Sequence, residues 1–306
     1  MRCSHRRKID QSAITKSDPT TTAIAIVLRE SNEVMNALPP CTFRRYLNAM
    51  LVREFVAYLE TIAPPQFAEG WDNVGLLVGG GDSPVTKVLL TVDFTREVAD
   101  EAETGRYDFV IAYHPPIFKP FRTLLSGEPV YRAVRAGIAL YSPHTALDVA
   151  PGGTNDLLAD AVGMVERSAL RPAEAHNVTI GLGRIGSVAP TTRDKLIARV
   201  KKQLHVDHVL VAGPRGGEVK RVAVGAGSCG DLVDAAIDGR ADVYVTGELG
   251  HHAALKAAAS GMTVVAVLHS NSERGALHAL AAQIVERWPA ISTSVSSRDR
   301  DPFAIV

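Results

Sequence analysis

The sequence has little cysteine, no excess of charge of either sign and no long apolar run. Its 306 residues include three cysteines, Cys3, Cys41 and Cys229, which are too few and too scattered for a disulfide framework or a thiolate zinc site. Lysine plus arginine and aspartate plus glutamate both number 33, so no net charge attracts the chain to nucleic acid or to an anionic membrane. No apolar run approaches the ~18 residues of a membrane-spanning helix. Direct DNA binding and membrane insertion are therefore not expected.

The remaining composition is that of an ordinary globular protein. Hydrophobic residues make up 46% of the chain and charged residues 22%, which suits one large domain or two modest ones with a buried core. The scarcity of cysteine favours a reducing compartment. We expect the cytoplasm, with the nucleus as a further candidate. Ten histidines are the feature that composition leaves unexplained.

The first 45 residues differ from the rest of the chain. They hold Ser/Thr clusters, an early basic run at Arg6–Lys8, and Pro39-Pro40. We expect residues 1–45 to be a poorly ordered extension or the product of an upstream start codon. A mitochondrial transit peptide is an alternative, although four acidic residues do not suit one: Asp10, Asp18, Glu30 and Glu33.

Alternating strands and helices are predicted from about residue 46 to the C-terminus. The spacing of apolar residues predicts amphipathic helices over 47–62 and 191–204. Short β-branched runs, typical of buried strands, occur at residues 88–92, 109–112, 138–142, 222–226, 243–246 and 263–268. Strand–helix–strand spacing of this kind predicts an α/β fold whose sheets are covered by helices.

One strand–helix–strand unit is repeated within the chain. Residues 87–114 align without a gap on residues 221–248, so that Val88 falls on Val222. A turn of the form Gly-Arg-x-Asp, residues 105–108, falls on residues 239–242. The alignment predicts two pseudo-duplicated halves, about 46–172 and 173–306.

Each half also contains a histidine followed four residues later by a carboxylate. The pairs are His144/Asp148 and His269/Glu273, and each follows a predicted strand. Residues four apart share one face of a helix, and α/β sheets bind ligands at the carboxyl ends of their strands. His114, in Tyr-His-Pro-Pro, ends a third strand. Together these residues predict a metal site, against the alternative of ordinary hydrogen-bonded histidines.

The type of ligand limits the type of metal. With imidazole and carboxylate donors and no cysteine nearby, the site favours zinc, manganese, iron or cobalt. Glu248 and His252, in the segment Thr246–His252, are candidates for orienting ligands, although a polar loop that opens the next helix explains them equally well.

Three further motifs support smaller predictions. Gly181–Gly186 matches G-x-G-x-x-G but does not join a strand to a helix, so we expect a glycine-rich turn between strands rather than a dinucleotide site. Trp71–Gly75 is expected to form a loop leading into a strand at 76–78. Its polar pair Asp72-Asn73 could approach the site, or Trp71 could simply pack there. Cys229 lacks the neighbours of a nucleophile.

In these motifs the chain resembles the NIF-three-like family, also catalogued as homologues of a type 2 GTP cyclohydrolase 1. The matching segments run in family order over residues 47–306: Gly70–Leu76, Tyr113–Phe118, Ser142–Asp148, Gly181–Gly186, Thr246–Glu248 with His251-His252, His269–Glu273 and Asp301–Phe303. Where bacterial members have His-His-Pro, this chain has Tyr113-His114-Pro115, which resembles the eukaryotic branch.

The resemblance implies two α/β halves with a dinuclear metal site between them. It implies His114, Asp148, His269 and Glu273 as ligands, with Glu273 bridging and His144 a ligand or close neighbour. Tyr113 in place of histidine removes one nitrogen ligand. Family members resemble ring-shaped hexamers, so a homo-oligomer is expected.

The resemblance implies two alternative functions. The first is a metal-dependent hydrolase acting on a nucleotide-like or cyclic amidine substrate, with Glu248 or His252 transferring protons. The second is a non-catalytic metal-binding partner in transcription regulation.

Overall fold

The computed structural model describes residues 50–174 and 177–306. The predicted N-terminal extension, residues 1–45, lies outside the described residues, as does His176. Within the described ranges no helix is long and apolar enough to cross a membrane.

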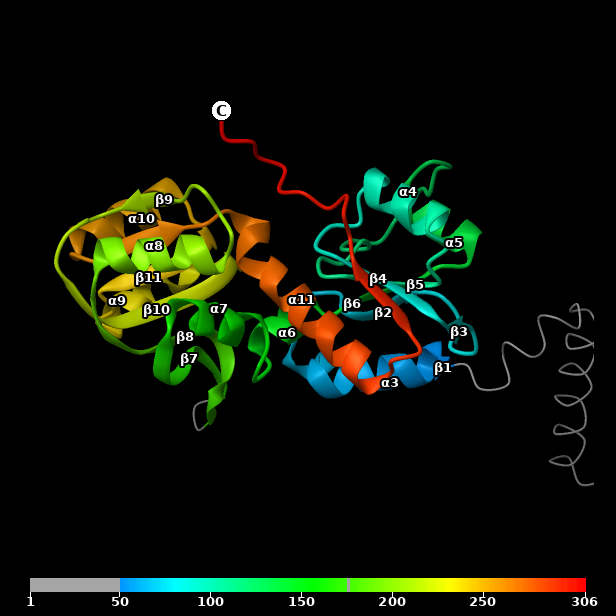
Figure 1. Cartoon of the computed structure of the whole chain (residues 1–306), viewed down its shortest axis with the longest axis horizontal. Helices are drawn as coiled ribbons and strands as arrows, with labels where there is room; N and C mark the ends of the chain where they lie inside the picture. Colours follow the sequence, from blue (N-terminus) through cyan, green and yellow to red (C-terminus); the bar gives the residue numbers. More distant parts are fainter. Residues whose placement is uncertain (1–49, 175–176) are drawn as a thin grey trace, which may run out of the picture. The chain divides into compact units, whose positions relative to one another are not determined.

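The first sheet has five strands in the order β13-β4-β5-β6-β2 (Figure 1). These are β13 (Ser292–Val295), β4 (Lys87–Thr91), β5 (Phe109–Ala112), β6 (Ala139–Ser142) and β2 (Gly75–Val78). Strands β13, β4, β5 and β6 run parallel, and β2 is antiparallel to β6. Strands β5 and β6 are buried throughout, as strands covered on both faces should be. A separate two-stranded pair joins β1 (Met50–Leu51) to β3 (Pro84–Val85).

The second sheet has six strands in the order β7-β8-β10-β11-β12-β9. These are β7 (Met164–Glu174), β8 (Asn177–Thr192), β10 (Glu218–Ser228), β11 (Val243–Glu248), β12 (Thr263–Ala266) and β9 (Leu210–Ala212). Strands β10, β11 and β12 run parallel. Each sheet therefore contains three neighbouring parallel strands linked through helices.

Helices cover both faces of each sheet because successive strand residues point to opposite sides. On the first sheet, α4 (Arg96–Thr104) and α5 (Pro129–Ala136) cover one face, and α3 (Val52–Ile62) covers the other. On the second sheet, α7 (Thr154–Val162) and α8 (Arg193–Gln203) lie opposite α9 (Val233–Asp238) and α10 (His251–Ala259). The remaining short elements are η1 (Pro65–Phe67), η2 (Gly230–Leu232) and α6 (His144–Val149).

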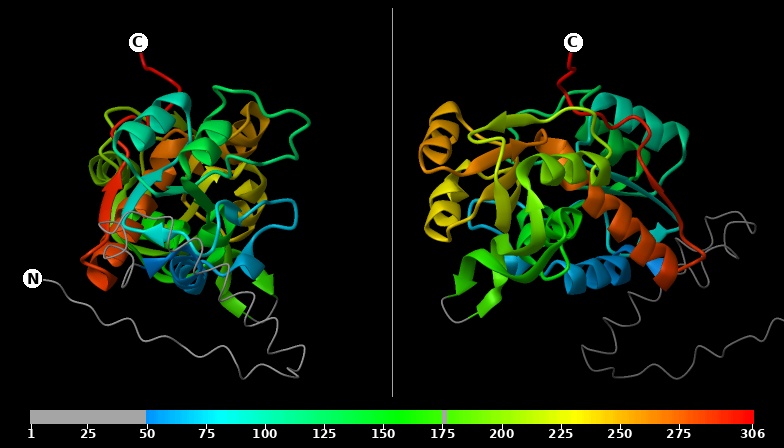
Figure 2. Two further views of the ribbon diagram at one scale, coloured as in Figure 1. Left: turned by 90° about the vertical axis from the view of Figure 1, so that its right-hand side faces the viewer. Right: turned by 60° about the vertical axis from the view of Figure 1, so that its left-hand side comes forward.

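Helix α11 (His269–Arg287) connects the two sheets (Figures 1 and 2). Its first turns contact β10 and β11 of the second sheet, and the helix also contacts β4 and β13 of the first. Ala276, Leu277 and Ile284 pack into the core beneath the first sheet. The start of α11 is thereby held where both sheets can supply side chains.

The predicted α/β fold is confirmed as a mixed α/β fold with several sheets. The helix expected over 47–62 begins at Val52, because Met50 and Leu51 pair with β3 instead. The helix expected over 191–204 spans Arg193–Gln203, and the Thr192 hydroxyl accepts a hydrogen bond at its start.

The predicted turn at Gly181–Gly186 is wrong: these residues lie inside strand β8. Their glycines are needed because neighbouring backbone comes too close for a side chain. A Cβ on Gly183 would lie 2.8 Å from the carbonyl of Val224, and one on Gly186 would lie 2.6 Å from that of Val165.

Two equivalent aspartates fix the starts of β4 and β10. The carboxylate of Asp108 accepts hydrogen bonds from the backbone of Thr86 and Lys87, at 2.9 and 3.0 Å. Asp242 accepts from the backbone of Lys220 and Arg221, at 2.8 and 3.0 Å. The basic side chains match as well, since Lys87 and Arg221 each donate at 2.7 Å to the carbonyl of the turn glycine that precedes β5 or β11.

We expect Asp108→Ala to lower the free energy of unfolding by about 2 kcal/mol, because it leaves two backbone N–H groups without their charged acceptor. Asp242→Ala should cost less, about 1 kcal/mol, because its hydrogen bonds lie nearer the surface. Urea denaturation checks both, with the exposed Asp238→Ala as control, which should stay within about 0.5 kcal/mol of wild type. Equal stability of Asp108→Ala and Asp238→Ala would contradict this role.

Candidate metal centre

Polar side chains collect where parallel strands of both sheets end. His114 lies just after β5, His144 begins α6 after β6, and His269 begins α11 after β12. Parallel strands place their carboxyl ends at one edge of a sheet, so the first two histidines meet at one edge and α11 brings the third to them. The rings of His114 and His144 are 5.4 Å apart, and those of His114 and His269 are 5.1 Å apart.

Three of these residues present ligand atoms to one another. The Nε2 atoms of His114 and His269 lie 3.3 Å apart. Glu273 places Oε2 3.3 Å from Nε2 of His114 and Oε1 3.2 Å from Nε2 of His269. All three ligand atoms lie within 4.8 Å of one another, which is the spacing of a possible cation site.

The opposite side of each imidazole is held by a carboxylate. Nδ1 of His114 lies 2.9 Å from Oδ1 of Asp93, and Nδ1 of His269 lies 3.0 Å from Oε1 of Glu248. An ionised carboxylate can only accept, so each Nδ1 donates and the Nε2 of each neutral ring is left with a lone pair. This is the arrangement in which carboxylates orient metal-binding histidines.

While both rings are neutral, the interior of the cluster holds acceptors without donors. Glu273 is buried, and its Oε2 finds no hydrogen-bond partner among the described residues. Protonating both rings would place two positive charges 3.3 Å apart. A single cation between the three side chains would satisfy all of them, so the donor set fits a metal ion.

The electrostatics of the cluster favour positive charge. Burial acts to lower the pKa of His114, but contacts with Asp93 and Glu273 outweigh it and raise that pKa to about 10. Contact with Glu273 likewise raises the pKa of His269 to about 9. Burial acts to raise the pKa of Glu273, but the two histidines lower it. The site thus holds an ionised carboxylate beside two strongly basic imidazoles.

A glycine leaves room beside the ligands. Gly227, at the end of β10, has a φ of +70°, and a Cβ there would lie 2.7 Å from Oε1 of Glu273 and 3.4 Å from Nε2 of His269. A side chain at this position would fill the space next to the ligand atoms. Sequence reasoning missed Gly227 and also Asp93, although Gly227 lies at the end of β10 and Asp93 follows β4.

Asp148 is buried and contacts hydroxyl groups. The hydroxyl of Tyr113 donates to Oδ1 of Asp148 and lies 2.8 Å from Oγ1 of Thr154. Burial and the negative charge of Glu273 raise the pKa of Asp148 to about 6. Tyr113 therefore hydrogen-bonds a predicted ligand.

His144 is held by the loop before β2. Its Nδ1 lies 2.7 Å from Oδ1 of Asp72, a carboxylate that also bonds the backbone and hydroxyl of Thr145. The polar pair of the Trp71–Gly75 loop thus approaches the site through Asp72. This agrees with one of the two interpretations that the sequence allows for that loop. The structure groups the ligand atoms of His114, His269 and Glu273, whereas His144 reaches this group through a ring contact with His114 and Asp148 is hydrogen-bonded to Tyr113.

The two residues predicted to transfer protons differ in position. Glu248, at the end of β11, contacts the site directly through His269. His252 is exposed on α10, with its ring 5.4 Å from that of His251.

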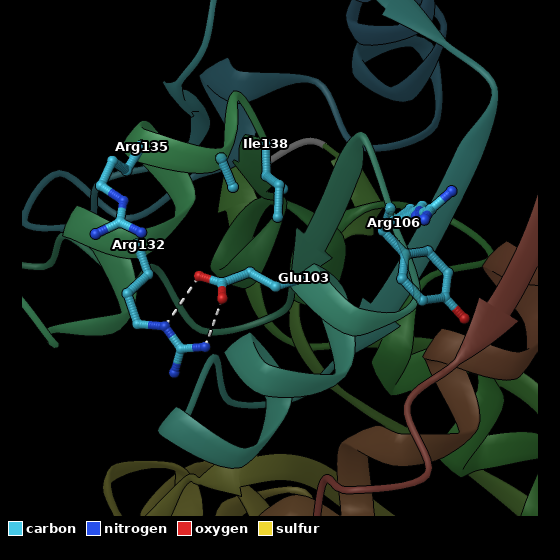
Figure 3. Close-up of a pocket in the computed structure, with 7 residues that line it drawn as sticks. Glu103, Arg106, Arg132, Arg135 and Ile138 are labelled. Carbon is cyan, nitrogen blue, oxygen red and sulfur yellow. Dashed lines mark hydrogen bonds and ion pairs between the residues drawn. The ribbon is translucent and has the colours of Figure 1, made fainter.

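A separate cavity of about 430 Å³ lies at the amino ends of strands in the first sheet (Figure 3). Its lining includes Arg106 and Ile138, which precede β5 and β6, whereas the metal centre lies where these strands end. Glu103 in this cavity is paired with Arg132. The cavity is therefore distinct from the histidine cluster.

Comparison with known proteins agrees with the fold and the motifs. Residues 50–302 match the sequence profile of the Duf34/NIF3 (NGG1p interacting factor 3) family. The chain is 36% identical over 268 residues to the protein NIF3 homolog of Schizosaccharomyces pombe, covering 80% of this chain and 94% of that one. It is 29% identical over 263 residues to the GTP cyclohydrolase 1 type 2 homolog of Clostridium perfringens, covering 84% and 100%.

A solved structure shares the fold. The crystal structure of a hypothetical protein from Staphylococcus aureus superimposes with a TM-score of 0.77 at 28% identity, covering 85% of this chain and 100% of that one. The predicted resemblance is confirmed: the chain belongs to the Duf34/NIF3 (NGG1p interacting factor 3) family.

Proposed function

We propose that this protein binds two divalent metal ions at the histidine cluster and is a metal-dependent hydrolase. The observation that carries the proposal is the buried set of acceptors formed by His114, His269 and Glu273, whose facing atoms lie 3.2–3.3 Å apart. No donor in the described residues satisfies Oε2 of Glu273, so a cation is the partner that this arrangement lacks.

We propose that Glu273 is shared by the two metal ions. We assign His114, His269 and Glu273 to one ion, and Asp148 with Glu273 to the other, with His144 as a ligand or close neighbour of the second. Zinc, manganese, iron and cobalt all suit this mixture of imidazole and carboxylate. Asp93, Asp72 and Glu248 act on the ligands rather than as ligands, because each holds the Nδ1 of one histidine.

The chemistry suits hydrolysis of a cyclic amidine or a nucleotide. A pair of bound divalent ions supplies a hydroxide at neutral pH and stabilises negative charge that develops on oxygen. Glu248 would move protons at the edge of the site, since its carboxylate is 47% exposed and contacts His269. His252 is the second proton-transfer candidate, with less support because it lies on the surface.

The two halves of the chain are similar, as products of a duplication would be. This similarity supports a site to which both halves contribute. In both sheets the order is strand, helix, Gly-Arg turn, strand, and Asp108 and Asp242 make the same pair of backbone hydrogen bonds. Arg106 and Arg240 both adopt a left-handed φ, 54° and 55°. We infer that the halves descend from one unit and that each contributes a histidine–carboxylate pair.

We further propose a homo-oligomer, of hexameric form as the family resemblance implies, located in the cytoplasm. The nucleus and the mitochondrion are alternative locations.

An alternative function is a non-catalytic interaction protein. The family description names an interacting factor, and a metal in such a protein would stabilise the fold or report metal supply. A partner in transcription regulation is the corresponding candidate.

Glu273→Gln should reduce the bound metal per chain by at least about half, because Glu273 contacts both histidines and a neutral amide binds cations poorly. Metal analysis after dialysis against zinc or manganese measures this. Glu286→Gln, an exposed change on the same helix, is the matched control and should bind as wild type does. Equal metal content in both variants, with both folded, would contradict the ligand assignment.

Glu248→Gln should lower kcat about 10- to 100-fold, because a neutral amide oxygen holds Nδ1 of His269 more weakly than a carboxylate does and cannot carry a proton. The assay incubates zinc- or manganese-loaded protein with GTP and a panel of nucleotides and separates the products by chromatography. Absence of turnover by wild-type protein of confirmed metal content would refute the hydrolase proposal.

The interaction alternative makes the opposite prediction for Glu273. If partner binding is the function, the Glu273→Gln variant should still retain a transcriptional adaptor in a pull-down, provided that it remains folded. Loss of binding in this variant but not in Glu286→Gln would link the interaction to the metal site.

A further inference from the structure

Trp71 is an exposed aromatic residue at the edge of the metal centre. Trp71 is 60% exposed. The centroid of its ring lies 6.0 Å from that of the His144 ring, in an edge contact. Phe118, 47% exposed, contacts it from the other side with ring centroids 5.9 Å apart. Tryptophan is usually buried on average because of its large apolar surface, so exposure here calls for an explanation.

The rings form a continuous row that ends at the ligands. From Phe118 the successive ring centroids are 5.9 Å to Trp71, 6.0 Å to His144, 5.4 Å to His114 and 5.1 Å to His269. Trp71 is therefore two steps from His114 in this row and Phe118 is three, within the reach of a small molecule bound at the cluster.

Hydrogen bonds fix the position of this pair. Asp72, the next residue after Trp71, holds His144 at 2.7 Å. Asn73 donates through Nδ2 to the carbonyl of Ile117 at 2.5 Å, which ties the Trp71 loop to the segment that carries Phe118. The loop that carries Trp71 is thus joined on one side to a candidate ligand, through Asp72, and on the other to the segment that carries Phe118, through Asn73.

We propose that Trp71 and Phe118 bind the planar heteroaromatic ring of the substrate by stacking and present it to the metal centre. A rigid aromatic side chain offers a large contact surface at little entropic cost, and stacking on it suits any flat ring. A nucleobase has this shape. The inference rests on the proposed function, since it names the substrate class of the same site.

The ring row favours a small ligand over a second copy of the chain as the occupant. The exposed face adjoins the candidate ligands, and its orientation depends on Asp72 and Asn73, which also position the site. A flat ring on Trp71 would keep its substituents within reach of the cluster.

The test uses intrinsic fluorescence, because the chain has two tryptophans. Trp288 packs against Phe55 and Tyr58, and Trp288→Phe leaves Trp71 as the only reporter. Zinc-loaded full-length protein is titrated with GMP, and with ribose 5-phosphate as the probe that lacks the ring. We expect saturable quenching by GMP and none by ribose 5-phosphate. Equal quenching by both probes would overturn the proposal, since recognition would then be of the phosphate.

Calorimetric measurement of GMP binding to two further variants distinguishes stacking on an aromatic face from contact with any large apolar side chain. Trp71→Leu keeps an apolar side chain without an aromatic face and should weaken GMP binding about tenfold, whereas Trp71→Phe should bind within about threefold of wild type. Unchanged GMP affinity in Trp71→Leu would overturn the proposal. So would a change in its oligomeric state by light scattering, which would make this surface a subunit interface.

Failure of this proposal can be told apart from failure of the hydrolase proposal. Ring-dependent quenching without turnover of any nucleotide supports stacking and refutes hydrolysis. Turnover of a substrate with no change in the Trp71 variants refutes stacking and supports hydrolysis.

Discussion

The candidate metal centre depends on a buried set of facing acceptor atoms that only positive charge can satisfy. Two imidazole nitrogens and a buried carboxylate oxygen face one another at 3.3 Å, and carboxylates on the far sides of the rings fix the histidine tautomers. Burying acceptors against acceptors is costly. The arrangement suits a cation, and the surrounding elements keep these atoms together.

The fold achieves this by bringing the ends of several strands to one place. His114 and His144 follow neighbouring parallel strands, whereas His269 and Glu273 lie on the first turns of α11. That helix packs its later turns beneath the first sheet, so its beginning is fixed relative to both sheets. Asp108 and Asp242 bond the neighbouring strands β4 and β10 away from this end. The candidate ligands therefore lie at the carboxyl ends of the parallel strands, and the two aspartates lie toward the amino ends.

Local patterns were sufficient to predict the residues that follow strands, because strand ends and His-x-x-x-carboxylate spacing are properties of neighbouring residues. Asp93 and Gly227 were not predicted, since their roles depend on contacts with His114 and Glu273 that are distant in sequence. Gly181–Gly186 was misassigned for a related reason. Glycine occurs both in turns and where another strand passes closely, and only the approach of Val224 and Val165 distinguishes the two.

The two carboxylates of the proposed dinuclear site are not equivalent. Glu273 lies between two imidazoles whose far nitrogens are held by further carboxylates, so its surroundings attract positive charge. Asp148 instead shares its oxygen with the hydroxyl of Tyr113, which must be displaced or must remain as a neighbour when a cation binds there. An imidazole at position 113 would offer a lone pair where the phenol offers a proton. The position between His114, His269 and Glu273 should therefore fill first, and the position beside Asp148 should bind more weakly.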